Sequence, residues 1–130
     1  MFVRFLLLAV ALSLTACGQS EDAGKPTRDP ALFARGGRAF ARLCMTCHSV
    51  DLSTHGAGPH LVALGGREAG SLKGFAYSPA MRASGIVWNA EILDRYLAGP
   101  EKMVPGTIML TAQVDDPEER EALIHYLLQH

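Results

Sequence analysis

Apolar residues recur at helical spacing just after residue 29. Phe33, Phe40 and Leu43 share one face of a helix, with one of the glycines at 36–37 on the same face. Asp29 can cap the first turn, and the proline that follows it suits the first helical position. The pattern therefore predicts a helix that begins near residue 30 and leads directly into residues 44–48.

Two later stretches have the same periodicity. Asn89 can cap the first, which Gly99 and Pro100 should end, and residues 116–119 supply a cap, a proline and an acidic first turn for the second. Ser78 can open a short helix before the first of these stretches. The apolar faces of the two stretches are Ile92, Leu93, Tyr96 and Leu97, and Leu123, Ile124, Leu127 and Leu128.

Residues 49–75 hold many glycines and little periodicity, and no segment has a convincing strand pattern. A loop of this length is uncommon in a compact domain unless something large fills its inner side. The sequence therefore predicts an all-α fold of short helices and loops that surrounds a large apolar group.

The chemistry of that group is indicated by Cys44-Met-Thr-Cys47-His48. Two thiols three residues apart, followed by an imidazole, form the attachment site of a c-type haem. Each thiol adds to one haem vinyl group, and His48 can then take one axial position on the iron.

Two other kinds of site use a CxxC pair. One is a redox dithiol, but the chain has no pattern typical of a thioredoxin-like βαβ frame. The other is half of a zinc site, but the third cysteine, Cys17, lies far upstream in an apolar segment. We therefore interpret Cys44 and Cys47 as haem attachment residues.

The N-terminal residues resemble a bacterial lipoprotein signal. Arg4 precedes an apolar run at 5–14, and Leu-Thr-Ala-Cys at 14–17 resembles the box whose cysteine is diacylated. We expect residues 1–16 to be removed, residues 17–30 to form a lipidated cysteine and flexible tether, and residues 31–130 to form the haem-binding domain. The alternatives are an ordinary cleaved signal or an uncleaved anchor. This organisation places the protein on the periplasmic side of a bacterial membrane, held through Cys17.

The composition suits one small domain. The chain has 130 residues, with 12 basic and 13 acidic side chains and a net charge of −1. Arg4 falls in the expected signal, so the remaining chain is mildly acidic. This balance argues against binding to nucleic acid.

A second iron ligand must come from another histidine or methionine: Met45, Met81, Met103, Met109, His55, His60, His125 or His130. Met45 lies inside the attachment motif and cannot reach the opposite haem face. The last two histidines lie on or beyond the C-terminal helix, where packing or solvation is the simpler role. Met109 follows a turn-rich segment at 105–108, and from the residues alone it leads Met103 only modestly.

These motifs together resemble the class I cytochromes c, both mitochondrial-type and bacterial, over about residues 33–128. The attachment motif, a Gly-Pro-x-Leu segment at 58–61 and a Pro-Gly-Thr-x-Met loop at 105–109 occur in the family's order. The resemblance implies a small cytochrome c fold around one covalent haem c. It also implies that Gly36 and Phe40 lie where the first helix crosses the last.

The resemblance implies roles for individual residues. Met109 becomes the second axial ligand, and the carbonyl of Pro59 accepts a hydrogen bond from His48. Groups around the haem propionates are Arg67, Tyr77 and Trp88, and the polar cluster near the second ligand is Tyr96 and Thr107. His55 would hold a loop in place. Without the resemblance, the tryptophan and Tyr96 are more simply core aromatics and the arginine a surface charge.

The implied function is transfer of single electrons between redox proteins, without catalysis and without a small-molecule substrate. Candidate partners are a quinol–cytochrome c oxidoreductase as donor, and a terminal oxidase or photosynthetic reaction centre as acceptor. Two alternatives stay open: a haem subunit fixed within an oxidoreductase complex, and a haem enzyme or gas-binding protein with a labile Met109.

The chain departs from the mitochondrial pattern at the haem edge, which that family surrounds with lysines. The matching positions here are Leu43, Gly56, Glu101, Ile108, Asp115 and Asp116. Strong electrostatic steering is therefore not expected. Leu43 and Ile108 indicate a small apolar docking patch instead. Met81 stands where the family usually carries a polar residue.

Overall fold

The computed structural model describes residues 29–111 and 113–130, and the expected signal, Cys17 and nearly all of the tether lie outside them. The described part contains five helices and no strand: α1 Pro30–Leu43, α2 Pro79–Ala83, α3 Ala90–Ala98, α4 Pro100–Met103 and α5 Pro117–Leu127. Its one isolated antiparallel bridge joins Glu68 and Val87. The predicted all-α fold is confirmed.

Side-chain caps begin the helices where the sequence predicted them. The carboxylate of Asp29 accepts the backbone N–H of Ala31 at 2.9 Å, and Asn89 accepts that of Ile92 at 2.9 Å. Ser78 and Asp116 cap α2 and α5 in the same way. Each cap satisfies an N–H group that has no partner within its helix.

Helix α4 was not expected. Gly99 and Pro100 do end α3, as predicted, but the chain turns at Gly99 and starts a new helix at the proline. A proline that cannot continue one helix is well suited to the first position of the next. The ring of Pro100 is buried, so this short helix adds to the core.

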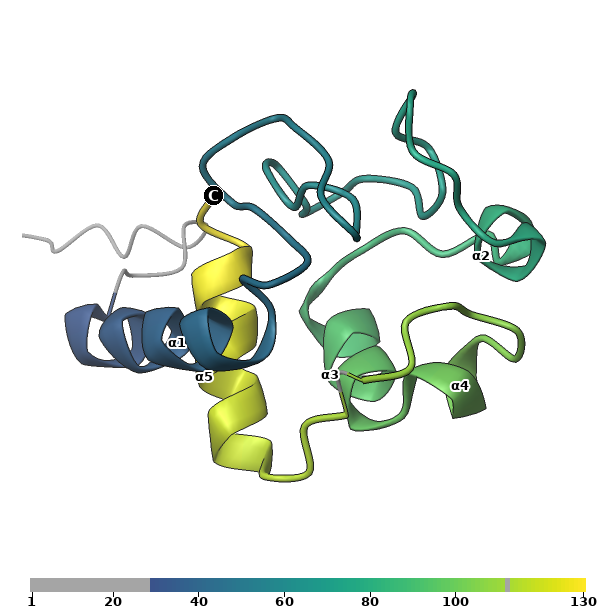
Figure 1. Cartoon of the computed structure of the whole chain (residues 1–130). Coiled ribbons are helices and arrows are strands. Elements are labelled where there is room, and N and C mark those ends of the chain that lie inside the picture. The colour runs from purple at the N-terminus through teal and green to yellow at the C-terminus, as the bar shows by residue number, and fades with distance from the viewer. Residues whose placement is uncertain (1–28, 112) are drawn as a thin grey trace, which may run out of the picture.

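The first and last helices cross in close contact (Figure 1). A Cβ added at Gly36 would lie 2.0 Å from the carbonyl oxygen of Ala122, so only glycine allows this approach. Leu123 is fully buried at the crossing, and the rings of Phe40 and Tyr126 pack with centroids 5.6 Å apart. The crossing implied for Gly36 and Phe40 is therefore present.

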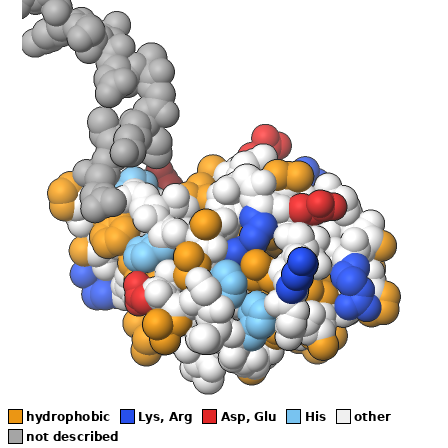
Figure 2. All heavy atoms as spheres, turned by 90° about the horizontal axis from the view of Figure 1, so that it is seen from above, with side chains coloured by type: hydrophobic (Ala, Val, Ile, Leu, Met, Phe, Trp, Pro, Cys, Tyr) orange, Lys and Arg blue, Asp and Glu red, His pale blue; other side chains and the backbone are white. Residues whose placement is uncertain are grey.

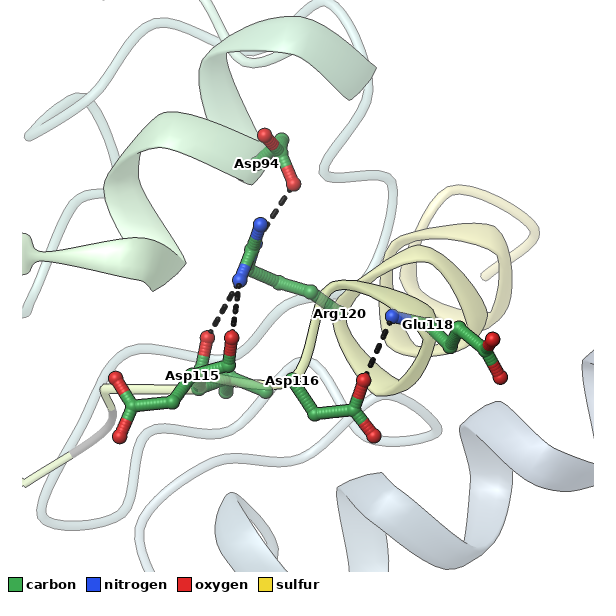
Figure 3. A network of polar contacts seen from close by, with 6 residues as sticks. Asp94, Asp115, Asp116, Glu118 and Arg120 are labelled. Atoms are coloured by element: carbon green, nitrogen blue, oxygen red, sulfur yellow. Dashed lines mark hydrogen bonds and ion pairs between the residues drawn. The ribbon is translucent and has the colours of Figure 1, made fainter.

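Arg120 joins α5 to α3 and to the chain between them (Figure 3). Its Nε donates to Asp94 at 2.7 Å, and its Nη1 donates to the carbonyls of Val114 at 2.8 Å and Asp115 at 3.2 Å. The arginine side chain is only 12% exposed. Hydrogen bonds from a shielded guanidinium are stronger than neutral ones. Arg120 therefore fixes the far end of the segment that follows Met109.

The loops at 49–77 arch over one side of the molecule, and α3 and α4 lie on the other (Figure 1). His55 holds two of these loops together: its Nε2 lies 3.0 Å from the carbonyl oxygen of Lys73, and its Nδ1 accepts the N–H of His60. This matches the structural role expected for His55. No described helix combines the length and apolar character needed to span a bilayer.

Candidate functional site

A largely apolar cavity lies between the loops and α3. It contains about 1180 Å³ of space, part of which is open to solvent. Its walls come from the end of α1, the loop at 57–64, α2, α3 and the segment 107–111. The predicted site residues in the described chain all line it: Cys44, Cys47, His48, Pro59, Arg67, Tyr77, Trp88, Tyr96, Thr107 and Met109.

The two thiols lie on one wall of the cavity. The N–H groups of Cys47 and His48 both donate to the carbonyl of Cys44, so the motif forms a single turn that follows α1. Neither thiol is in a disulfide. Burial raises the pKa of the Cys44 thiol to about 11, and Cys47 adds to the increase. A thiol that stays protonated at neutral pH is a poor redox nucleophile, whereas burial suits an uncharged thioether.

The described chain offers no alternative metal site for these cysteines. Nowhere in it do three His, Cys, Asp or Glu side chains come together in a way that could hold a metal ion. A structural zinc site needs four such ligands. The zinc interpretation of the CxxC pair therefore has no support in this part of the molecule.

His48 is held by the loop that faces it. Its Nδ1 lies 2.6 Å from the carbonyl oxygen of Pro59, to which it donates. With the proton on Nδ1, the lone pair is on Nε2, the form in which an imidazole binds a metal. Burial lowers the pKa of His48, and the hydrogen bond to Pro59 partly opposes this change. The ring is therefore neutral at physiological pH.

Gly58 allows that loop to lie against the ring. A Cβ at this position would be 2.3 Å from Cε1 of His48, and the N–H of Gly58 donates to the carbonyl of Cys47 at 2.9 Å. Sequence reasoning gave this glycine no role of its own. Its position directly before Pro59, whose carbonyl was expected to face His48, could have indicated this role.

Met109 lies in the segment that forms another part of the cavity wall. The hydroxyl of Tyr96 donates to Sδ of Met109 at 3.5 Å and lies 3.2 Å from Oγ1 of Thr107. Thr107 in turn accepts the N–H of Met109 at 3.3 Å. Burial raises the pKa of Tyr96, although the contact with Thr107 lowers it, so the phenol keeps its proton as a donor.

The cavity reduces the candidates for a second ligand. Of the methionines and histidines considered from the sequence, only Met81 and Met109 line it. Met45 is 61% exposed, and Met103 lies outside the cavity wall. Gly106 has φ of +88°, which glycine adopts without strain, and this turn brings the segment with Met109 to the cavity.

Arg67, Tyr77 and Trp88 lie together at the loop side of the cavity. The guanidinium donates to the carbonyls of Val62 at 2.7 Å and His60 at 3.0 Å, so part of its role is to close a loop. Trp88 is 8% exposed and packs edge-on against the ring of Tyr96. Contact of Arg67, Tyr77 and Trp88 with the haem propionates stays a prediction.

Comparison with known proteins identifies similar chains. Residues 33–130 match the family model described as cytochrome c. Cytochrome c2 iso-2 of Magnetospirillum molischianum is 40% identical over 85 residues, which cover 65% of this chain and 88% of that protein. Cytochrome c of Chlamydomonas reinhardtii is 41% identical over 98 residues, which cover 75% of this chain and 88% of that protein.

A solved structure agrees with these similarities. Cytochrome cH from Methylobacterium extorquens matches with a TM-score of 0.69 at 38% identity. The match covers 75% of this chain and 97% of that one.

Proposed function

Since this chain belongs to the cytochrome c family, we propose that Cys44 and Cys47 would bond its haem covalently and that His48 and Met109 would supply the protein ligands of the iron. The family binds one covalent haem c and carries electrons, so the protein is a monohaem electron carrier rather than an enzyme. Haem c supplies one reversible Fe(II)/Fe(III) couple.

One observation carries the assignment of ligands: His48 and Met109 line the same cavity, and each is oriented by a hydrogen bond from a different element. Pro59 fixes the imidazole and Tyr96 fixes the thioether. Because both ligands are provided by the chain, no coordination position is left for a substrate. The apolar walls and the thioether favour the reduced state.

The other walls of the cavity also suit a haem. The buried thiol of Cys44 stays uncharged, and a side chain at Gly58 would push His48 out of its orientation. Arg67 is the one charged side chain, other than a histidine, among the described residues that line the cavity, so we assign it, with Tyr77 and Trp88, to the propionate side. Thr107 and Tyr96 support the methionine.

The N-terminal segment supports a membrane-tethered carrier. Residues 1–16 would be removed, Cys17 would carry lipid, and residues 17–30 would connect it to the cytochrome c domain at 31–130. The protein would then lie on the periplasmic side of a bacterial membrane. It would pass electrons from a quinol–cytochrome c oxidoreductase to a terminal oxidase or reaction centre. Confinement to the membrane of its partners raises their effective concentration.

The direct test uses the holoprotein made in an export-competent host. Mass spectrometry should find one haem on the peptide that contains Cys44 and Cys47, and diacylglycerol on Cys17 as the first residue. A redox titration should fit a single one-electron step. A haem-free peptide would refute the attachment residues, and an unmodified Cys17 would refute only the tether.

Replacing Tyr96 should change the potential without removing the ligand. Tyr96→Phe deletes the hydroxyl that donates to Met109, which makes the sulfur a better donor to ferric iron. Loss of about 1 kcal/mol of hydrogen bonding corresponds to a fall on the order of 40 mV, measured by redox titration. Tyr126→Phe is the control, because Tyr126 does not line the cavity. Equal shifts in both variants would contradict the proposed bond.

A further inference from the structure

Two large aliphatic side chains lie exposed on either side of Met109. Ile108 is 64% exposed and Leu110 is 68% exposed, whereas Met109 between them is half-buried and lines the cavity. Ile108 also lines the cavity, so it lies at the mouth. We call Ile108 and Leu110 the aliphatic pair. Exposed aliphatic side chains at the mouth of a functional cavity indicate a surface for contact with another protein.

The rest of the mouth is uncharged. The other exposed or half-buried lining residues near it include Leu43, Cys47, Ala57 and Thr111. Among the described lining residues, the only lysine, arginine, aspartate or glutamate is Arg67, and its guanidinium donates to loop carbonyls. A charged group on a docking partner would therefore find no free counter-charge in the cavity wall.

Charges elsewhere do not produce a field of one sign. Arg42, next to Leu43, forms an ion pair with Glu119, and Arg35 pairs with Glu118 at 3.5 Å. The face seen in Figure 2 carries both Lys or Arg and Asp or Glu side chains, with hydrophobic and histidine side chains among them. At ordinary salt concentrations, dissolved ions screen interactions between exposed charges that are more than about 10 Å apart. Long-range attraction to a highly charged partner is therefore weak.

We propose that the redox partner docks on the aliphatic pair at the cavity mouth with an uncharged, apolar surface, so that electron transfer depends little on salt. This inference rests on the proposed function, which makes the cavity the place from which electrons leave. The lack of charge at the mouth indicates the kind of partner. A charged group buried there would lose its hydration, and no counter-charge in the cavity wall would offset that cost. An apolar face instead gains from covering Ile108 and Leu110. The small area suits a short-lived complex.

The test measures transfer rates of the holoprotein as salt rises from about 10 mM to about 300 mM. One arm is electron self-exchange, in which a second copy supplies a partner with the same uncharged mouth. The other is quinol-dependent reduction by membranes of the source organism, followed by stopped flow. We expect less than about a threefold change in either rate over this range. A steep fall of the membrane rate with salt would mean a charged partner and would overturn the proposal.

Variants locate the surface. Ile108→Lys should slow both reactions about tenfold, because the partner must then bury an unpaired charge. Leu52→Lys is the matched control: Leu52 is 62% exposed but lies outside the cavity wall, and its variant should stay within about twofold. Equal slowing by both variants would refute docking at the mouth. The wild-type titration separates the two proposals, since a normal one-electron step with steep salt dependence removes only the docking surface.

Discussion

Gly36→Ala should lower the free energy of unfolding of the holoprotein by at least about 3 kcal/mol. The added Cβ would lie 2.0 Å from the carbonyl oxygen of Ala122 and 2.6 Å from Cβ of Tyr126. Both atoms are fixed to the α5 backbone, so α1 and α5 must move apart. That movement opens the packing around Phe40 and Leu123, which are 4% and 0% exposed. Denaturant unfolding, followed by far-ultraviolet circular dichroism, measures the loss.

The neighbouring glycine provides the control. At Gly37, a Cβ would meet only the ring of Tyr126, at 3.2 Å from Cε2. An aromatic ring can shift by a few tenths of an ångström, and alanine is about 1 kcal/mol better than glycine inside a helix. Gly37→Ala should therefore change the stability by less than about 1 kcal/mol. If the two alanine variants were equally stable, the close approach at Gly36 would not be what the crossing depends on.

Met109→Ala should leave haem attached but remove one of the two proposed iron ligands. Cys44 and Cys47 are unchanged, so the covalent bonds form as before. The far-red methionine–iron absorption band should disappear, the iron should become high-spin, and cyanide and carbon monoxide should bind rapidly. Loss of the thioether should also lower the reduction potential, on the order of 0.2 V. Absorption spectroscopy and redox titration measure these changes.

Two other methionines test the specificity of that result. Met81 also lines the cavity and Met103 does not, so alanine at either position should keep the far-red band if Met109 is the ligand. A band that survives in Met109→Ala and vanishes in Met81→Ala would transfer the role to Met81. Rapid cyanide binding by the unaltered protein would instead favour a labile ligand, the property of a haem enzyme or gas-binding protein.

Local signals made most helix starts predictable. Asp29, Ser78, Asn89 and Asp116 each combine a capping side chain with the start of a periodic segment, and each does cap a helix. Helix α4 was missed because Pro100 can both end one helix and begin another. The neighbouring residues do not show whether a new helix starts at this proline. Its ring is buried in the folded core, and that tertiary contact favours the new helix.

The site was partly predictable for a different reason. The spacing of Cys44, Cys47 and His48 follows from haem chemistry, so it is visible without a structure. The choice of Met109 over Met103 needed the family resemblance, because a ligand from a distant loop has no fixed spacing. In the structure, Met81 and Met109 line the cavity and Met103 does not, so the structure reduces the candidate methionine ligands to these two.

Arg120 shows why tertiary roles are hidden in the sequence. It stands between Glu119 and Glu121 on an amphipathic helix, a pattern typical of a solvated face. In the folded chain it is shielded and donates to Asp94, Val114 and Asp115. The packing of α5 beside α3 gives it Asp94, and the turn of the chain before α5 gives it the two carbonyls. The role of Gly58 was missed for the same reason, because its contact is with the ring of His48, ten residues earlier in the chain.

The crossing of α1 and α5 has a consequence for biogenesis. The first helix finds its packing partner only when the last helix has been synthesised, so this crossing cannot form on an incomplete chain. Contacts between such distant segments form late, because a long loop must close first. Cys44 and Cys47 directly follow α1, and on the proposed export route they would therefore stay accessible until the last helix arrives.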